Sequence, residues 1–120
     1  MRQYGLLGKS LSHSFSKPYF EEKFKINDLK DHSYDNFEID NIEKVTQLVK
    51  DNLELVGFNV TIPFKESIIP YLNSLDKNAD SIGSVNTVLI NRKDLTLKGF
   101  NTDYIGFKQS IKPFLELQPT

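Results

Sequence analysis

The chain of 120 residues contains no cysteine and no tryptophan, and it has only two histidines, His13 and His32. Without cysteine there is neither a disulfide nor a thiolate metal site. Zinc in proteins prefers cysteine and histidine, so a zinc site here would need carboxylates for most of its ligands. The composition therefore predicts no metal site.

Long hydrophobic runs and an excess of charge of one sign are also missing. No stretch approaches the ~18 consecutive apolar residues of a membrane-spanning helix, and the N-terminal apolar stretch is too short for a secretory signal peptide. The formal net charge is −1 and the basic residues are spread along the chain, which is not the electrostatic footprint of a nucleic-acid or membrane binder. We therefore expect a cytoplasmic protein that binds neither.

What is present is the composition of one globular domain, with 38% hydrophobic and 26% charged residues. Apolar periodicity and turn residues divide the chain into alternating elements. The predicted strands cover residues 4–7, 32–39, 53–62, 84–91 and 95–101. Helices are predicted over residues 18–25 and 76–83, and from residues 42, 63 and 103 onward. This order predicts an α/β fold, a mixed sheet flanked by helices in a single three-layer domain.

Asparagine and threonine recur at the ends of the predicted strands, in "NVT" (59–61), "VNT" (85–87) and "NTD" (101–103). Asparagine is a poor strand former, so each of these asparagines lowers the local stability of its strand. Ligands of open α/β sheets bind beyond the carboxyl ends of strands. If the three segments converge, they form a cluster of neutral hydrogen-bonding groups with one carboxylate, Asp103. Such a cluster suits a ligand with several hydroxyls.

The serine-rich loop over residues 9–18 can add donors for a carboxylate. The alternative is that these polar residues only make turns and helix caps, and that Asp103 caps the helix that follows it.

Lys65 follows one of these segments, in "FNVTIPFKES" (58–67), at the predicted start of a helix. The positive end of a helix disfavours a lysine. Its long stem can carry the charge to solvent, or the ammonium can point into the polar cluster. There, burial would lower the pKa of Lys65 and Asp103 would raise it, a balance that suits proton transfer.

Four segments carry a resemblance to a known family: "GKSLSHSFSKPYF" (8–20), "GFNVTIPFKE" (57–66), "GSVNTV" (83–88) and "GFNTDYIGF" (99–107). In their order and spacing, the chain resembles the N-terminal, substrate-binding domain of shikimate dehydrogenase. Enzymes of this family interconvert 3-dehydroshikimate and shikimate with NADP, in aromatic amino acid biosynthesis. The resemblance therefore implies an NADP-linked oxidoreductase with a small-molecule substrate.

The resemblance also assigns roles to seven residues. Two serines would hold the substrate carboxylate, an asparagine and two threonines would bind near the ring and its hydroxyls, and a lysine and an aspartate would be the catalytic pair. The substrate-binding residues are Ser14, Ser16, Thr61, Asn86 and Thr102, and the catalytic pair is Lys65 and Asp103.

By the same resemblance, residues 1–102 form the shikimate-binding domain and residues 103–120 begin a helix that links to an NADP-binding domain. The chain contains no G-x-G-x-x-G turn for a pyrophosphate. We therefore expect a domain, excised or naturally truncated, that catalyses no hydride transfer alone and has surface for homo-oligomer formation.

Two other interpretations stay open. One is a non-catalytic module that binds shikimate or quinate as a sensor or regulatory domain. The other is a structural domain without a ligand. The choice between NADP and NAD is not encoded in these residues.

Overall fold

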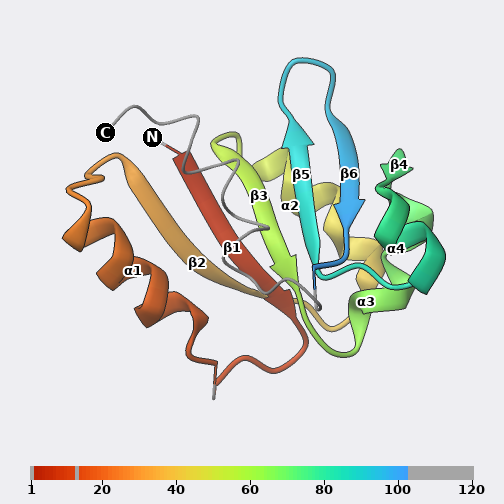
Figure 1. Ribbon diagram of the computed structural model, residues 1–120, viewed down its shortest axis with the longest axis horizontal. Coiled ribbons are helices and arrows are strands. Elements are labelled where there is room, and N and C mark those ends of the chain that lie inside the picture. Colours follow the sequence, from red (N-terminus) through yellow and green to blue (C-terminus); the bar gives the residue numbers. More distant parts are fainter. Residues whose placement is uncertain (1, 13, 103–120) are drawn as a thin grey trace.

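A six-stranded mixed sheet forms the centre of the computed structural model, which describes residues 2–12 and 14–102 (Figure 1). Its strands are β1 (Arg2–Gly8), β2 (His32–Glu38), β3 (Leu55–Val60), β4 (Ser74–Leu75), β5 (Thr87–Asn91) and β6 (Thr96–Phe100). The helices are α1 (Ser16–Ile26), η1 (Ile42–Lys44), α2 (Val45–Asp51), α3 (Phe64–Ser67), η2 (Ile69–Tyr71) and α4 (Lys77–Ile82).

The strand order is β2-β1-β3-β5-β6-β4, and β5 runs against all the others. β1 pairs in parallel with both β2 and β3, whereas β5 is antiparallel to β3 and to β6, and β4 is parallel to β6. Consequently, the carboxyl ends of five strands and the start of β5 point to the same edge of the sheet.

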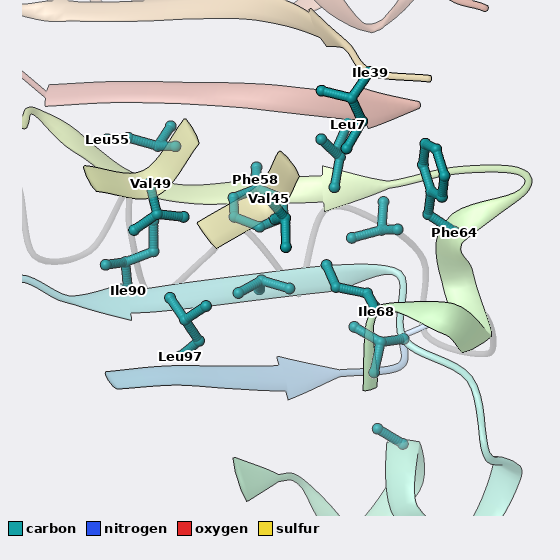
Figure 2. Packing of buried hydrophobic residues seen from close by; sticks show 14 residues of the cluster. Leu7, Ile39, Val45, Val49, Leu55, Phe58, Phe64, Ile68, Ile90 and Leu97 are labelled. Carbon is teal, nitrogen blue, oxygen red and sulfur yellow. The ribbon is translucent and has the colours of Figure 1, made fainter. Parts of the chain in front are cut away.

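Helices cover both faces of the sheet and create two apolar cores. On one face, Phe20 and Phe24 of α1 pack against Tyr4, Leu6 and Tyr34. On the other face, α2, α3 and α4 pack on the sheet around a larger core, whose members interdigitate in Figure 2. Burial of these apolar side chains on both faces stabilises the three-layer arrangement.

The predicted fold class is confirmed, and most elements lie where the sequence predicts them. The expected hairpin is formed by β5 and β6. Asp76 caps α4 by accepting a hydrogen bond from the backbone N–H of Ala79 (2.8 Å), and Gly83 ends α4 with φ of 74°. A left-handed residue of this kind favours glycine. None of the helices within residues 2–12 and 14–102 has the length and apolar character needed to cross a membrane.

Several details of the sequence-based prediction are wrong, and one is the strand predicted over residues 53–62, which forms β3 only over Leu55–Val60. Ser16 was expected in the loop, but it is the first residue of α1. β5 begins at Thr87 rather than at residue 84. The two-residue strand β4 was not predicted, because so short a segment has no measurable alternation.

His32 predicts how the stability of the domain depends on pH. Its ring packs against those of Tyr4 and Phe24, with centroid distances of 5.7 and 5.5 Å, and its two ring nitrogens are buried without a hydrogen-bond partner. Burial, aided by the charge of Arg2, lowers the pKa of His32 below its ordinary value of 6.5. The unfolded chain therefore binds a proton at His32 at a higher pH than the folded chain does.

We expect the free energy of unfolding to be highest above pH 6.5 and to fall as the pH falls through that value. Urea unfolding at several pH values measures this decrease. His32→Phe, which keeps an aromatic ring at the same place, is expected to reduce the slope between pH ~7.5 and ~5.5. An unchanged slope would show that His32 does not contribute to it.

Candidate functional site

The predicted site residues that the structure describes lie around the sheet edge where β1, β3 and β6 end and β5 begins. Backbone hydrogen bonds join these ends directly. Thr61 N donates to Leu7 O (3.0 Å), Val60 N to Asn86 O (2.8 Å), and Asn86 N to Phe100 O (2.9 Å). Because β5 is antiparallel, its first residues, and not its last, meet the carboxyl ends of its neighbours.

A chain of side-chain hydrogen bonds crosses this edge of the sheet. Tyr34 Oη donates to Asn59 Oδ1 (2.9 Å), and Asn59 Nδ2 donates to Thr87 Oγ1 (3.2 Å). Thr87 Oγ1 in turn donates to Asn86 Oδ1 (3.1 Å). We call Tyr34, Asn59 and Thr87 the buried relay, since they retain only 2%, 9% and 2% of their exposed area.

The relay ends at candidate residues on both sides. Asn86 Oδ1 also accepts from Thr102, both from the backbone N–H (3.2 Å) and from Oγ1 (3.3 Å). At the other end, the hydroxyl of Ser16, at the start of α1, influences the pKa of the Tyr34 phenol. Burial raises the pKa of Tyr34, and the hydrogen bond with Ser16 acts in the opposite direction. The phenol is therefore neutral at physiological pH and serves as a hydrogen-bond donor.

The serine loop is fixed by its own hydrogen bonds. Ser14 N donates to Leu11 O (3.0 Å), and Ser14 Oγ accepts from Ser16 N at the start of α1 (3.2 Å). Leu11 N donates to a carboxylate oxygen of Glu38 (2.8 Å). Both predicted serines are half-buried, so they are held in place and still partly accessible to a ligand.

Thr61 and Lys65 lie on the connection from β3 into α3. Phe64 N donates to Thr61 O (3.0 Å), and Lys65 O accepts from Val85 N (2.8 Å), which ties α3 to the segment before β5. Thr61 packs closely on Gly8, where an added Cβ would lie 2.7 Å from Thr61 Cγ2. Gly8 therefore allows the serine loop to leave β1 directly beside Thr61.

Lys65 is the second residue of α3, as predicted, but α3 has only four residues. The helix field that disfavours a lysine is therefore weak, because few peptide dipoles add to it. The side chain is half-buried, and its ammonium group makes no hydrogen bond or ion pair with another described side chain. Lys65 thus has the position and the charge to contact an oxygen atom of a ligand.

Asp103, the predicted partner of Lys65, lies outside the described residues, so its role stays a prediction. The structure brings Ser16, Asn86 and Thr102 together through the buried relay, and it joins Thr61 and Lys65 to the same edge through the backbone. Within residues 2–12 and 14–102, no cluster of three or more histidine, aspartate or glutamate side chains is placed to hold a metal ion.

Sequence reasoning missed one functional candidate and left two others unassigned. Asn59 and Thr87 lie in the "NVT" and "VNT" segments, which the sequence singles out without giving these two residues a role. Tyr34 gave no signal, because tyrosine is an ordinary residue in strands. The connection among these three residues depends on the pairing of β3 with β5, which places Asn59 opposite Thr87.

Two cavities of the structure lie elsewhere. One, of about 820 Å³, opens at the opposite edge of the sheet, where β5 ends and β6 begins, and Asn91, Arg92 and Thr96 contribute to its lining. The other, of about 340 Å³, lies between α1 and β2. Neither contains a predicted site residue, so we assign the site from its chemistry and hydrogen bonding and not from cavity size.

Comparison with known proteins agrees with this geometry. Residues 6–88 match the model of the shikimate dehydrogenase substrate binding domain. Among curated proteins, the NADP(+) shikimate dehydrogenase of Methanosphaera stadtmanae is 42% identical over 116 residues, which are 95% of this chain and 40% of that protein. That of Clostridium beijerinckii is 42% identical over 110 residues, with 89% and 39% covered.

Solved structures give the same result. Shikimate dehydrogenase 1 of Peptoclostridium difficile superposes with a TM-score of 0.80 at 38% identity, over 96% of this chain and 43% of that chain. A Thermus thermophilus shikimate 5-dehydrogenase in complex with shikimate has a TM-score of 0.77 at 31% identity, over 94% and 42%.

The fold and the polar sheet edge are those of a substrate-binding α/β domain. The family match extends over more than half of the chain, and the chain belongs to the shikimate dehydrogenase substrate binding domain family. It spans about 40% of the length of the curated relatives that it matches.

Proposed function

We propose that this chain binds shikimate and 3-dehydroshikimate at the polar sheet edge and supplies the substrate half of an NADP-dependent dehydrogenase. The observation that carries the proposal is the continuous set of hydrogen bonds that runs from Tyr34 through Asn59 and Thr87 to Asn86 and Thr102. It holds neutral donors and acceptors at one edge, which is what a hydroxyl-rich ring requires.

Each candidate residue has a role in this proposal. Ser14 and Ser16 bind the substrate carboxylate at the start of α1. Thr61, Asn86 and Thr102 bind the ring and its hydroxyls. These neutral side chains give directional contacts without a charge that would have to be compensated.

Lys65 is the general acid and general base of the proposed reaction. Reduction of a ketone leaves an alkoxide oxygen that must gain a proton. The ammonium group of Lys65, placed beside that oxygen, stabilises the developing charge and donates the proton. In the reverse direction the neutral amine accepts a proton from the hydroxyl. Asp103 would orient Lys65 and bind a neighbouring hydroxyl.

The described residues do not fit an NADP site. The first strand–helix connection, from Gly8 to Ser16, contains serines where a dinucleotide-binding turn needs glycines. A pyrophosphate at this turn would also compete with the hydrogen bond from Ser16 N to Ser14 Oγ. The hydride would therefore come from a cofactor held by another part of the protein. NADP rather than NAD is proposed because the curated relatives are NADP(+) enzymes.

The formation of NADPH tests whether this chain supplies only the substrate-binding half of the reaction. Mixed with shikimate and NADP, the 120-residue chain is expected to form none. The same chain joined to the remainder of the Peptoclostridium difficile relative is expected to form it. Turnover by the chain alone would contradict the proposal. A joined protein that folds and binds shikimate but forms no NADPH would favour the alternative, a non-catalytic sensor of shikimate or quinate.

The cytoplasm is the proposed location, as expected of a metabolic dehydrogenase that uses a soluble cofactor.

Association into a homo-oligomer is part of the same proposal. Sedimentation velocity measures it directly, and a monomer at the highest concentration reached would contradict it.

A further inference from the structure

The hydrogen bonds of the buried relay have a defined donor-to-acceptor direction, because they lead to a group that can act only as a donor. A hydroxyl rotates, and an amide can turn over, but a backbone N–H can only donate. Thr102 N donates to Asn86 (3.2 Å), which requires the oxygen of that amide, Oδ1, to face Thr102. The orientation of the Asn86 side chain is therefore set by the backbone at the end of β6.

The direction then passes from group to group across the sheet. Since Asn86 presents Oδ1, Thr87 Oγ1 must donate to it, and Thr87 Oγ1 then accepts from Asn59 Nδ2. Asn59 Oδ1 consequently faces Tyr34, which donates to it. The phenol oxygen, which donates its proton to Asn59, can then act only as an acceptor toward other groups. Each hydroxyl or amide has one role that is consistent with both of its neighbours.

Burial makes this arrangement costly to break. The three relay residues are at least nine-tenths buried, so a group that loses its partner cannot take a water molecule from bulk solvent instead. Loss of one hydroxyl therefore leaves a buried donor or acceptor unsatisfied, and the remaining groups must turn to reduce that cost. A substitution at one end of the relay is therefore expected to change the orientation of the hydrogen-bonding groups at the other end.

We propose that Tyr34, Asn59 and Thr87 are positioning residues, which fix the amide of Asn86 and the hydroxyl of Ser16 in one relative orientation for the ligand. Because Thr87 and Thr102 both donate to Oδ1, the Asn86 side chain is held in one orientation at this edge of the sheet. The relay couples the carboxylate end of the site to the hydroxyl end. This inference rests on the proposed function for its ligand, but not for its hydrogen bonds.

Two nearly isosteric variants of the 120-residue chain test the coupling. Thr87→Val removes the hydroxyl in the middle of the relay, and Tyr34→Phe removes the one beside Ser16. Thr87→Ser keeps a hydroxyl and serves as the rescue. Tyr4→Phe is the matched control, because Tyr4 is equally buried on the same face of the sheet (2% exposed) but lies outside the relay.

The ligand-free arm measures the side-chain amide signals of Asn86 and the backbone amide signals of Ser16 and Thr102 by NMR. Tyr34→Phe is expected to shift the Asn86 signals, and Thr87→Val those of Ser16, whereas Tyr4→Phe leaves both in place. Thr87→Ser should restore the original spectrum at Ser16. If each variant changes only its own neighbours, the positioning role is wrong.

The ligand arm titrates shikimate into each variant after urea unfolding has shown that it is folded. Thr87→Val and Tyr34→Phe are expected to weaken binding by about 3- to 10-fold, in line with the loss of one hydrogen bond, and Thr87→Ser by less. Folded variants with unchanged affinity would overturn the proposal. Failure of the unsubstituted chain to bind shikimate would overturn the proposed function, while the ligand-free arm would still decide whether the relay is coupled.

Discussion

Replacing Lys65 by methionine is expected to lower kcat about 10²- to 10⁴-fold in the protein that joins this chain to the remainder of the Peptoclostridium difficile relative. Methionine keeps the length and flexibility of the side chain but removes the group that donates the proton. General acid–base catalysis by a positioned side chain contributes a factor of about this size. Because Lys65 acts on an oxygen whose charge develops during the reaction, KM should change much less than kcat.

Lys77→Met is the matched control for this experiment. Lys77 also lies in the first turn of a short helix, α4, but it is exposed and its helix is capped by Asp76. We expect kcat to be unchanged in this variant. A Lys65→Met protein with nearly full kcat would remove Lys65 from the chemistry, and equal losses in both variants would point to a general effect of lost charge.

Replacing Phe58 by alanine is expected to lower the free energy of unfolding by about 3–5 kcal/mol. Phe58 lies in the middle of β3, is 3% exposed, and belongs to the larger core between the sheet and helices α2 to α4 (Figure 2). The substitution removes a large apolar side chain and leaves a cavity that the surrounding strands cannot fill. Since domains are stable by only about 5–15 kcal/mol, the variant should be marginally folded.

Phe15→Ala is the matched control for the loss of a phenylalanine. Phe15 precedes α1 and is 84% exposed, so its removal should change the free energy of unfolding by less than about 0.5 kcal/mol. Urea unfolding of both variants measures the difference. Similar losses in the two variants would contradict the placement of the core on this face of the sheet.

Much of the fold could be predicted because local patterns agree with the tertiary structure. Asp76 and Gly83 are strong helix signals, and they bound α4 as expected. The Arg92–Asp94 turn between two apolar runs is a strong hairpin signal. The sequence predicts the start of α1 too late, because Pro18 is typical of the first turn of a helix, whereas the helix begins at Ser16. A single local signal sets a boundary only to within a few residues.

The candidate site could be predicted only in part, for a physical reason. Residues such as Asn86 and Thr102 follow or precede strands, so their place at an edge can be read from the sequence. The relay cannot be read in this way, since it depends on which strands are neighbours and on their register. Asn59 meets Thr87 only because β3 pairs with β5 in that register, and Tyr34 reaches Asn59 across β1.

The most direct test of the central claim is a titration of shikimate into the 120-residue chain, followed by the amide NMR signals. The account predicts changes that cluster at the sheet edge and saturate with ligand. The expected residues are Ser14, Ser16, Thr61, Lys65, Asn86, Thr102 and Asp103. No change at millimolar shikimate, or changes confined to the opposite edge around Arg92 and Thr96, would contradict the claim that this edge is the substrate site.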